Sequence, residues 1–323
     1  TLVFDYPTIT EMVERVMALL FPDTEAAASE SSSNQSDRPA FASTIVPIQP
    51  HGSRPPYFFV SGILGTVLDL QPLSQALDSE QPFYGLRSLG LDEAIPPYTT
   101  MEAIAAYHIH ALQAVQSTGP YHLGGYSFGG KVAFEMAQQL QKQGARVASL
   151  TLIDIQRQVP AIEQTADQWS DIQYITELAK FYQGLVDQPL VLSPDDFSKA
   201  HDPLQVLQTA LQTAGQTMTT LDLQRALAVY KANTQASAAY RPQPLKGIPV
   251  TLIRAETVGA LGDYLPNAAQ TDHDPTWGWQ PLVDTLTVKT VPGNHFTLLR
   301  FPHVWTLAQT FSDTLHGQDL PSE

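Results

Sequence analysis

Cysteine is absent from the 323 residues of this chain. Its absence excludes disulfide bonds, thiolate catalysis and metal sites built from cysteine. Basic residues are also scarce, with 17 lysines and arginines against 32 acidic residues and a net charge of -15. This balance argues against nucleic acid or an anionic membrane surface as a partner, because both attract a basic face. An acidic surface keeps a protein soluble.

Long hydrophobic runs are missing as well. No apolar run reaches the roughly 18 residues that a membrane-spanning helix needs. The N-terminus lacks the basic region and the apolar segment of a signal peptide. Hydrophobic residues nevertheless make up 43% of the chain, which suffices for a sizeable core. We therefore expect a cytoplasmic globular protein.

The N-terminal part differs in character from the rest of the chain. A capping box, T-I-T-E at 8–11, begins a segment whose apolar residues recur at helical spacing, so that one amphipathic helix is expected within residues 1–22. A helix of this length cannot bury its apolar face alone. Residues 23–43 are rich in serine, alanine and acidic residues, and this composition predicts a flexible linker.

From about residue 45, short apolar segments alternate with longer segments of helical periodicity. This alternation predicts an α/β fold over residues 44–316, with a mostly parallel sheet and helices on both faces. The alternation stops at about residues 157–246, where the pattern is helical throughout. We expect this segment to be a helical lid inserted between two strands of the sheet. Residues 317–323 are expected to be a C-terminal tail.

The pentapeptide G-Y-S-F-G at 125–129 matches the motif G-x-S-x-G. A strand pattern at 121–123 precedes it and a helical pattern at 131–140 follows it, so the motif lies on a strand–turn–helix. This arrangement predicts Ser127 as a nucleophile exposed at the carboxyl edge of the sheet. The alternative is a glycine-rich turn whose serine merely caps a helix, and the flanking strand and helix argue against it.

Serine needs a general base, and the base needs an orienting acid. In the fold that carries this motif, the order along the chain is serine, acid, histidine. His295 follows an apolar strand in the turn P-G-N-H-F, which predicts that it reaches the sheet edge as the base. Asp154 ends the apolar strand after the nucleophile and is the preferred acid. A carboxylate buried there needs a charged partner, because burial without one costs several kcal/mol or more, and the imidazolium of the base is such a partner. Glu256, at the end of the next strand, is the alternative, and Asp263 and Asp274 are weaker candidates.

The first long apolar strand ends in the loop S-G-I-L-G at 61–65. In this fold, the loop after that strand supplies one backbone N–H group of the oxyanion hole, and the residue after the nucleophile supplies the other. We therefore expect Ile63 and Phe128 to be the two donors. The sequence assigns no substrate-binding side chain and no metal ligand.

Together, these segments resemble the integrated thioesterase domains that end polyketide and nonribosomal peptide synthases. The resemblance covers about residues 45–316 and rests on GGYSFGGKVAFEMAQQL, LTLID, VPGNHFTLL, YRPQP before IPVTLIRAE, and WGW after it. It implies an α/β-hydrolase fold and a Ser–His–Asp triad with its acid at Asp154. Residues 1–22 resemble the last helix of an acyl carrier protein. One departure concerns the oxyanion loop, which usually opens with His-Pro in this family and here reads Ser61-Gly62.

The resemblance implies a chain-terminating thioesterase, which takes an acyl chain from a carrier-protein thioester onto Ser127 and releases it by hydrolysis or macrocyclisation. The substrate would arrive on the phosphopantetheine arm of the upstream acyl carrier protein of the same synthase. We expect no metal or redox cofactor. Two alternatives stay open: a free-standing serine esterase or lipase that acts on small esters, and a catalytically inactive module that docks a carrier protein.

Overall fold

The computed structural model describes residues 44–91, 95–157, 168–186, 188–257 and 274–316. The chain divides into two units, residues 1–42 and residues 43–323, and the described residues all belong to the second unit. The predicted carrier-like helix, the predicted linker and the predicted C-terminal tail therefore lie outside the described residues.

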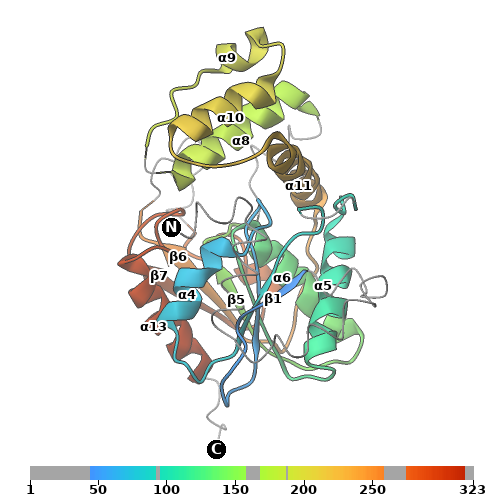
Figure 1. Cartoon of the computed structure of the whole chain (residues 1–323). Helices are drawn as coiled ribbons and strands as arrows, with labels where there is room; N and C mark the ends of the chain where they lie inside the picture. The colour runs from blue at the N-terminus through green and yellow to red at the C-terminus, as the bar shows by residue number, and fades with distance from the viewer. Residues whose placement is uncertain (1–43, 92–94, 158–167, 187, 258–273, 317–323) are drawn as a thin grey trace, which may run out of the picture. The chain divides into compact units, whose positions relative to one another are not determined.

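A seven-stranded sheet lies at the centre of the second unit (Figure 1). The strand order is β1-β3-β2-β4-β5-β6-β7, and every neighbouring pair is parallel except β1 and β3. The predicted α/β fold with a mostly parallel sheet is thus confirmed. The strands are β1 (Ile45–Gln49), β2 (Tyr57–Val60), β3 (Phe83–Leu86), β4 (Tyr121–Tyr126), β5 (Val147–Ile153), β6 (Val250–Ala255) and β7 (Leu286–Val291).

Within the described residues, helices cover both faces of this sheet (Figure 1). One face carries α5 (Met101–Val115) and α6 (Phe128–Lys142), and the other carries α4 (Gln71–Ala76) and α13 (His303–His316). Strand β2 shows how the sequence serves both layers, because its four residues are all buried. They alternate between the two cores, as side chains on a strand must, so a strand covered on both sides reads as a continuous apolar run.

Strand β1 is a feature that the sequence pattern did not predict. Its residues, IVPIQ, are only partly buried and include Pro47, which lies where the register with β3 shifts. Proline removes a backbone donor and is tolerated in a sheet mainly at an edge or a bulge. Because β1 is the edge strand and pairs antiparallel, it lacks the continuous apolar character of the inner strands.

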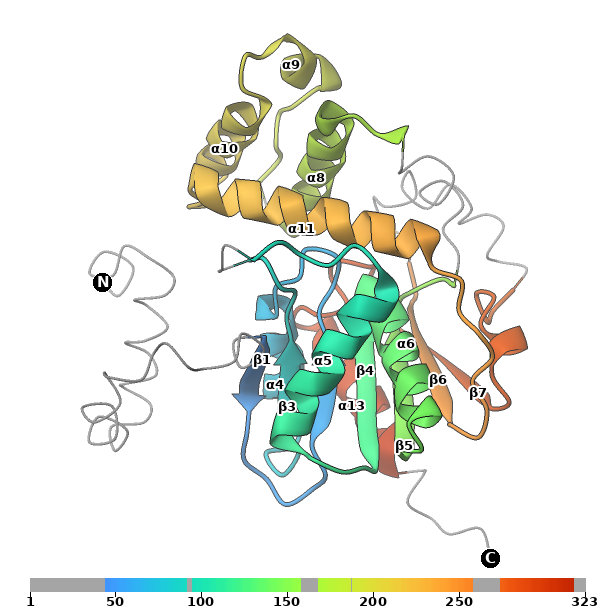
Figure 2. The ribbon, with the colours of Figure 1, turned by 90° about the vertical axis from the view of Figure 1, so that its right-hand side faces the viewer.

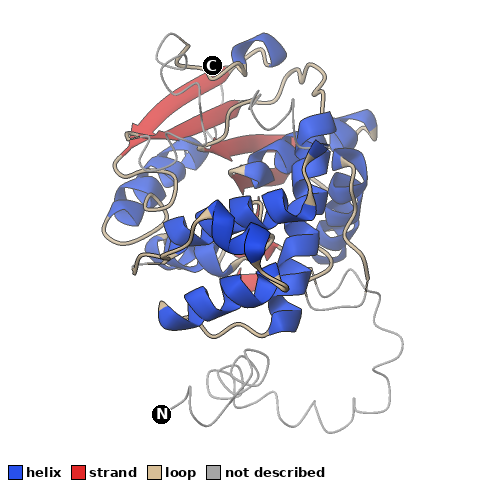
Figure 3. Cartoon of the chain, turned by 90° about the horizontal axis from the view of Figure 1, so that it is seen from above, coloured by secondary structure: helices blue, strands red, loops and turns tan. Residues whose placement is uncertain are grey.

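The segment between β5 and β6 is helical and contains α8 (Asp171–Leu185), α9 (Pro194–Lys199), α10 (Pro203–Thr213) and α11 (Thr220–Ala239). These helices lie within the segment predicted as a lid, and in Figures 2 and 3 they cover one end of the sheet. Polar residues at their starts satisfy free N–H groups: the side chains of Ser170, Asp202 and Thr219 accept hydrogen bonds from the first turns of α8, α10 and α11.

Helices α8–α11, called the lid from here on, have an apolar core of their own, which includes Leu207 and Leu211 of α10 and Leu223 of α11. One member of this core comes from outside the lid: Leu64, in the loop after β2, is 7% exposed and packs among the lid residues. The lid and this loop therefore share one apolar core. Among the described helices, none combines the length and the apolar character required to cross a membrane.

Candidate active site

Ser127 lies in the sharp turn between β4 and α6, as the motif predicted. Its φ of 54° is in the left-handed region, which is rare for residues other than glycine, and its N–H group donates a 2.8 Å hydrogen bond to the carbonyl of Ile153. The turn requires glycine around it. A Cβ atom on Gly125 would lie 2.0 Å from the Gly129 carbonyl oxygen, and one on Gly129 would lie 2.3 Å from the carbonyl oxygen of Ser61.

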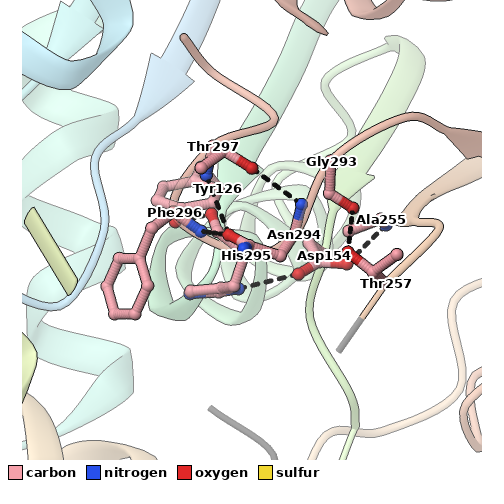
Figure 4. A network of polar contacts seen from close by, with 9 residues as sticks. All are labelled: Tyr126, Asp154, Ala255, Thr257, Gly293, Asn294, His295, Phe296 and Thr297. Carbon is pink, nitrogen blue, oxygen red and sulfur yellow. Dashed lines mark hydrogen bonds and ion pairs between the residues drawn. The ribbon is translucent and has the colours of Figure 1, made fainter. Parts of the chain in front are cut away.

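Asp154 follows β5, His295 follows β7, and their side chains meet in a buried pair (Figure 4). The distance between His295 Nδ1 and Asp154 Oδ2 is 2.8 Å. The other carboxylate oxygen, Oδ1, accepts a 2.7 Å hydrogen bond from the N–H group of Ala255. With both oxygens engaged, the carboxylate fixes the orientation of the imidazole and leaves Nε2 for another partner.

The alternative acids do not make this contact within the described residues. The side chain of Glu256 is exposed, and its backbone N–H group continues the β6–β7 ladder by donating to the carbonyl of Val291. The carboxylate of Asp274 accepts hydrogen bonds inside its own turn. Asp263 lies outside the described residues. Among the described candidates, Asp154 is therefore the carboxylate that the fold brings to His295.

Tyr126 links the nucleophile to the histidine. It immediately precedes Ser127, its ring stacks on the His295 ring with centroids 4.9 Å apart, and its hydroxyl donates a hydrogen bond to the His295 carbonyl (Figure 4). Burial, and next the negative charge of Asp154, raise the pKa of Tyr126 well above its ordinary value, so it stays a donor. Among the residues that the structure describes, no hydrogen bond joins the Ser127 hydroxyl to His295. In enzymes such a bond often tightens only when substrate binds.

The strand register places Ser127 and Asp154 at one edge of the sheet. Tyr126 is paired with Ile153 in the parallel β4–β5 ladder, so the residues that follow them leave the sheet side by side. His295 arrives from β7, two strands further along. The three predicted residues thus all lie beyond the carboxyl ends of their strands, where open parallel sheets place their ligands.

Two residues of this site were not predicted from the sequence, Tyr126 and Asn294. Asn294 holds the turn that carries His295. Its Oδ1 accepts hydrogen bonds from the N–H groups of Phe296 and Thr297, and its own N–H group donates to the Thr297 hydroxyl (Figure 4). Asparagine is common in such turns because its side chain can bond the backbone two residues on. The sequence P-G-N-H-F therefore contained a signal that predicts this turn. No sequence pattern near Tyr126 predicts its hydrogen bond to His295, which lies 169 positions away.

The two predicted oxyanion donors lie next to the nucleophile. Phe128 is the first residue of α6, and the first N–H groups of a helix have no partner within the helix. The loop containing Ile63 passes close by, because a Cβ atom on Gly62 would lie 4.0 Å from Ser127 Cβ and 3.3 Å from the Tyr126 ring. A side chain at position 62 would therefore be tight against the Tyr126 ring and in ordinary contact with Ser127.

A cavity of about 150 Å³ opens beside the loop that contains Ile63. Its wall includes the loop at 62–66, Tyr126 and Phe296, and residues Phe181 and Leu185 of α8 close it from the lid side. Asp69 and Arg300 add two charged groups to this lining. Burial raises the pKa of Asp69, and the charge of Arg300 partly opposes that change. Within the described residues, no three histidine or acidic side chains are grouped as a metal ion would require.

The sheet order, the serine turn after β4, the acid after β5 and the histidine after β7 are the features of the α/β-hydrolase class, the fold class that the sequence predicted. The thioesterase domain family matches residues 55–315, and the chain belongs to this family. The predicted kinship with synthase thioesterase domains is thereby confirmed. The resemblance of residues 1–22 to a carrier protein stays a prediction.

Relatives with curated functions are large synthetases. An atromentin synthetase of Suillus grevillei is 26% identical over 324 residues, which covers 98% of this chain and 32% of that protein. The chondramide synthase of Chondromyces crocatus is 29% identical over 277 residues, which covers 82% of this chain and 7% of that protein. The chain thus spans about a third or less of the length of these relatives.

Solved structures agree on the fold. The chain superposes on a four-domain nonribosomal peptide synthetase with a TM-score of 0.77 at 22% identity, covering 99% of this chain and 22% of that one. It superposes on the Vlm2 thioesterase domain, solved with a bound dodecadepsipeptide, with a TM-score of 0.59 at 21% identity, covering 84% of this chain and 98% of that one.

Proposed function

We propose that this domain is a serine thioesterase that ends the work of a synthase by taking an acyl chain from a carrier-protein thioester onto Ser127 and releasing it. The observation that carries the proposal is the 2.8 Å bond between His295 and Asp154, at the sheet edge where the strained turn holds Ser127. Membership of the thioesterase family supports thioesters as the substrate class.

In the acylation step, the Ser127 hydroxyl oxygen attacks the thioester carbonyl carbon while His295 Nε2 takes its proton. Asp154 stabilises the imidazolium that forms. The negative oxygen of the tetrahedral intermediate is held by the N–H groups of Ile63 and Phe128, and each such donor lowers the barrier by roughly 3–4 kcal/mol. The intermediate collapses, the carbon–sulfur bond breaks, and the imidazolium returns the proton to the departing thiolate.

In the release step, a nucleophile attacks the carbonyl carbon of the acyl-serine ester and His295 takes its proton. The second tetrahedral intermediate collapses, the bond from that carbon to the Ser127 oxygen breaks, and the imidazolium returns the proton to the Ser127 oxygen. Water gives a free carboxylic acid, and a hydroxyl or amine of the acyl chain itself gives a ring. The largely apolar lining between Phe181 and Phe296 favours an acyl chain with an apolar segment beside the carbonyl. In this scheme His295 accepts and returns each proton, and no step requires a metal or a redox cofactor.

Delivery by a carrier protein is supported by the relatives, which are synthetases several times longer than this chain. Residues 1–22, with the pattern of a carrier's last helix, support the same arrangement. An upstream acyl carrier protein of the same synthase, presenting the acyl group on its phosphopantetheine arm, is therefore the partner that we propose.

The proposal can be tested by comparing acyl N-acetylcysteamine thioesters and carrier-bound acyl thioesters with simple esters of the same acyl chain. We expect the thioesters to be cleaved with the higher kcat/KM. Ser127→Ala should lower that value by at least about 10⁴-fold and abolish labelling by a fluorophosphonate probe. Ser149→Ala, which changes another buried serine, is the matched control and should retain both.

Two results would contradict the proposal in different ways. A strong preference for simple esters would favour a free-standing esterase or lipase. A folded wild-type protein that neither cleaves thioesters nor reacts with the probe would favour an inactive docking module. Mass spectrometry of the products from hydroxyacyl thioesters would separate hydrolysis from ring closure.

A further inference from the structure

The loop that carries Ile63 is held by the lid helix α11. Asn233 of α11 is 1% exposed, and its Nδ2 donates a 2.8 Å hydrogen bond to the carbonyl of Ile63 and a 3.3 Å bond to the hydroxyl of Ser88. The N–H group of Ser88 in turn donates to the carbonyl of Gly65, at the other end of the loop. Asn233 thus bonds Ile63 in the middle of the loop and also Ser88, which holds the end of the loop at Gly65.

Packing reinforces these hydrogen bonds. Gly65 has a φ of 76°, and a Cβ atom there would lie 2.4 Å from Ser88 Cβ and 3.1 Å from Cγ1 of Val229. Val229 precedes Asn233 by four residues, so both lie on one face of α11. Leu64 inserts into the apolar core of the lid. Both sides of the loop are therefore fixed by lid residues.

These contacts fix the direction of the Ile63 N–H group. The Gly62 carbonyl, which shares a peptide unit with that N–H group, accepts a 2.9 Å hydrogen bond from Gly65 within the loop. In a trans peptide the N–H group points opposite to the carbonyl, so it points away from Gly65. The next peptide unit is fixed by the bond from Asn233 to the Ile63 carbonyl. Both peptide units around Ile63 are thereby oriented.

We infer that Asn233 is a positioning residue for the oxyanion hole, and that the lid is part of the catalytic apparatus through it as well as a cover for the acyl chain. This inference rests on the proposed function. Displacement of a donor by about 1 Å can cost on the order of 100-fold in rate. A lid that shifts α11 would therefore switch transition-state stabilisation off together with access to the site.

The test uses the full chain and measures kcat and KM separately with an acyl N-acetylcysteamine thioester. Asn233→Asp keeps the shape of the side chain but replaces the donor with an acceptor opposite the Ile63 carbonyl. We expect kcat to fall about 100-fold while KM stays within about threefold. Asn233→Ala, which removes the donor without adding charge, is the second variant and should lower kcat about tenfold.

A readout specific to the oxyanion hole separates positioning from a loss of fold. An alkyl boronic acid forms a tetrahedral adduct on serine, whereas the product carboxylate binds as a ground state. In both Asn233 variants, affinity for the boronic acid should fall by the factor seen in kcat, and affinity for the product should stay constant. Thr234→Val, which removes the buried neighbouring hydroxyl bonded to the Tyr230 carbonyl of the same helix, is the control.

Each outcome has one meaning. An active wild type with unchanged kcat in both Asn233 variants overturns this inference alone. Equal losses of boronic acid and product affinity overturn it too, since they indicate general disruption of the site. A wild type without thioesterase activity overturns the proposed function and the inference with it.

Discussion

The sheet and the lid differ in what holds their residues in place. Strands β4 and β5 at the centre of the sheet are buried on both faces, and their ends place Ser127 and Asp154 by register. The lid is a smaller layer of helices with its own apolar core. It meets the rest of the domain through apolar packing of Leu64 and Ala236 and through polar contacts such as Asn233 to Ile63 and Ser237 to Lys131.

This difference indicates a division of work. Backbone ladders place the proposed nucleophile and acid. The proposed base, His295, follows β7 and is held by side chains at the same sheet edge, those of Asn294, Tyr126 and Asp154. The oxyanion loop and the cavity wall depend on side-chain contacts with α8 and α11, and we expect these contacts to open without unfolding of the sheet. The predictions below break or sharpen this contrast, beginning with the largest effect.

Asp154→Asn should give the largest change, because it alters the sheet edge itself. The amide cannot stabilise the imidazolium and favours the wrong tautomer, so kcat for thioester cleavage should fall by about 10⁴-fold. Glu256→Gln, on the exposed rival acid, should stay within about twofold of the wild type. Steady-state kinetics on both variants checks this. A greater loss of kcat in Glu256→Gln than in Asp154→Asn would show that the acid is Glu256, at the end of β6.

A pair of core truncations tests whether lid and sheet are separate cooperative units. Leu152 in β5 and Leu207 in α10 are both 0% exposed, and replacing either by alanine should cost about 3 kcal/mol. We expect Leu152→Ala to lower the stability of the whole domain in urea. Leu207→Ala should instead speed amide exchange within α8–α11 alone, as followed by hydrogen–deuterium exchange. Faster exchange in β4 and β5 of that variant would refute the separation.

The smallest effect concerns acid stability of the sheet layer. His108 of α5 is buried, its Nδ1 has no hydrogen-bond partner among the described residues, and burial lowers its pKa to about 4 from 6.5. The unfolded state therefore binds the proton first as the pH falls below 6.5, and stability is lost from there down to about 4. Between pH 7.5 and 5 the loss is about 2 kcal/mol.

The measurement is the urea denaturation of the wild type and His108→Leu at both pH values. The variant should lose less stability on acidification by that amount. His110→Gln, on the exposed face of the same helix, is the control and should behave like the wild type. Equal acid sensitivity in wild type and His108→Leu would show that this histidine contributes nothing.

Prediction from the sequence succeeded where local pattern and chain order carry the information. The apolar strands, the helix after Ser127 and the fold class were all predictable, because buried strands and amphipathic helices have distinct periods. The edge strand β1 was missed, since it is half-buried and interrupted by Pro47. The bond from Tyr126 to the His295 carbonyl was missed because it joins residues from different strands.

The sequence by itself determined the class of fold and the candidate nucleophile, base and acid, because a motif framed by a strand and a helix constrains its own geometry. Only the tertiary structure decided that Asp154 rather than Glu256 meets His295, and that Asn233 reaches the Ile63 carbonyl. The physical reason is that these contacts join segments distant along the chain. Their distances follow from strand register and helix packing, which no local pattern specifies.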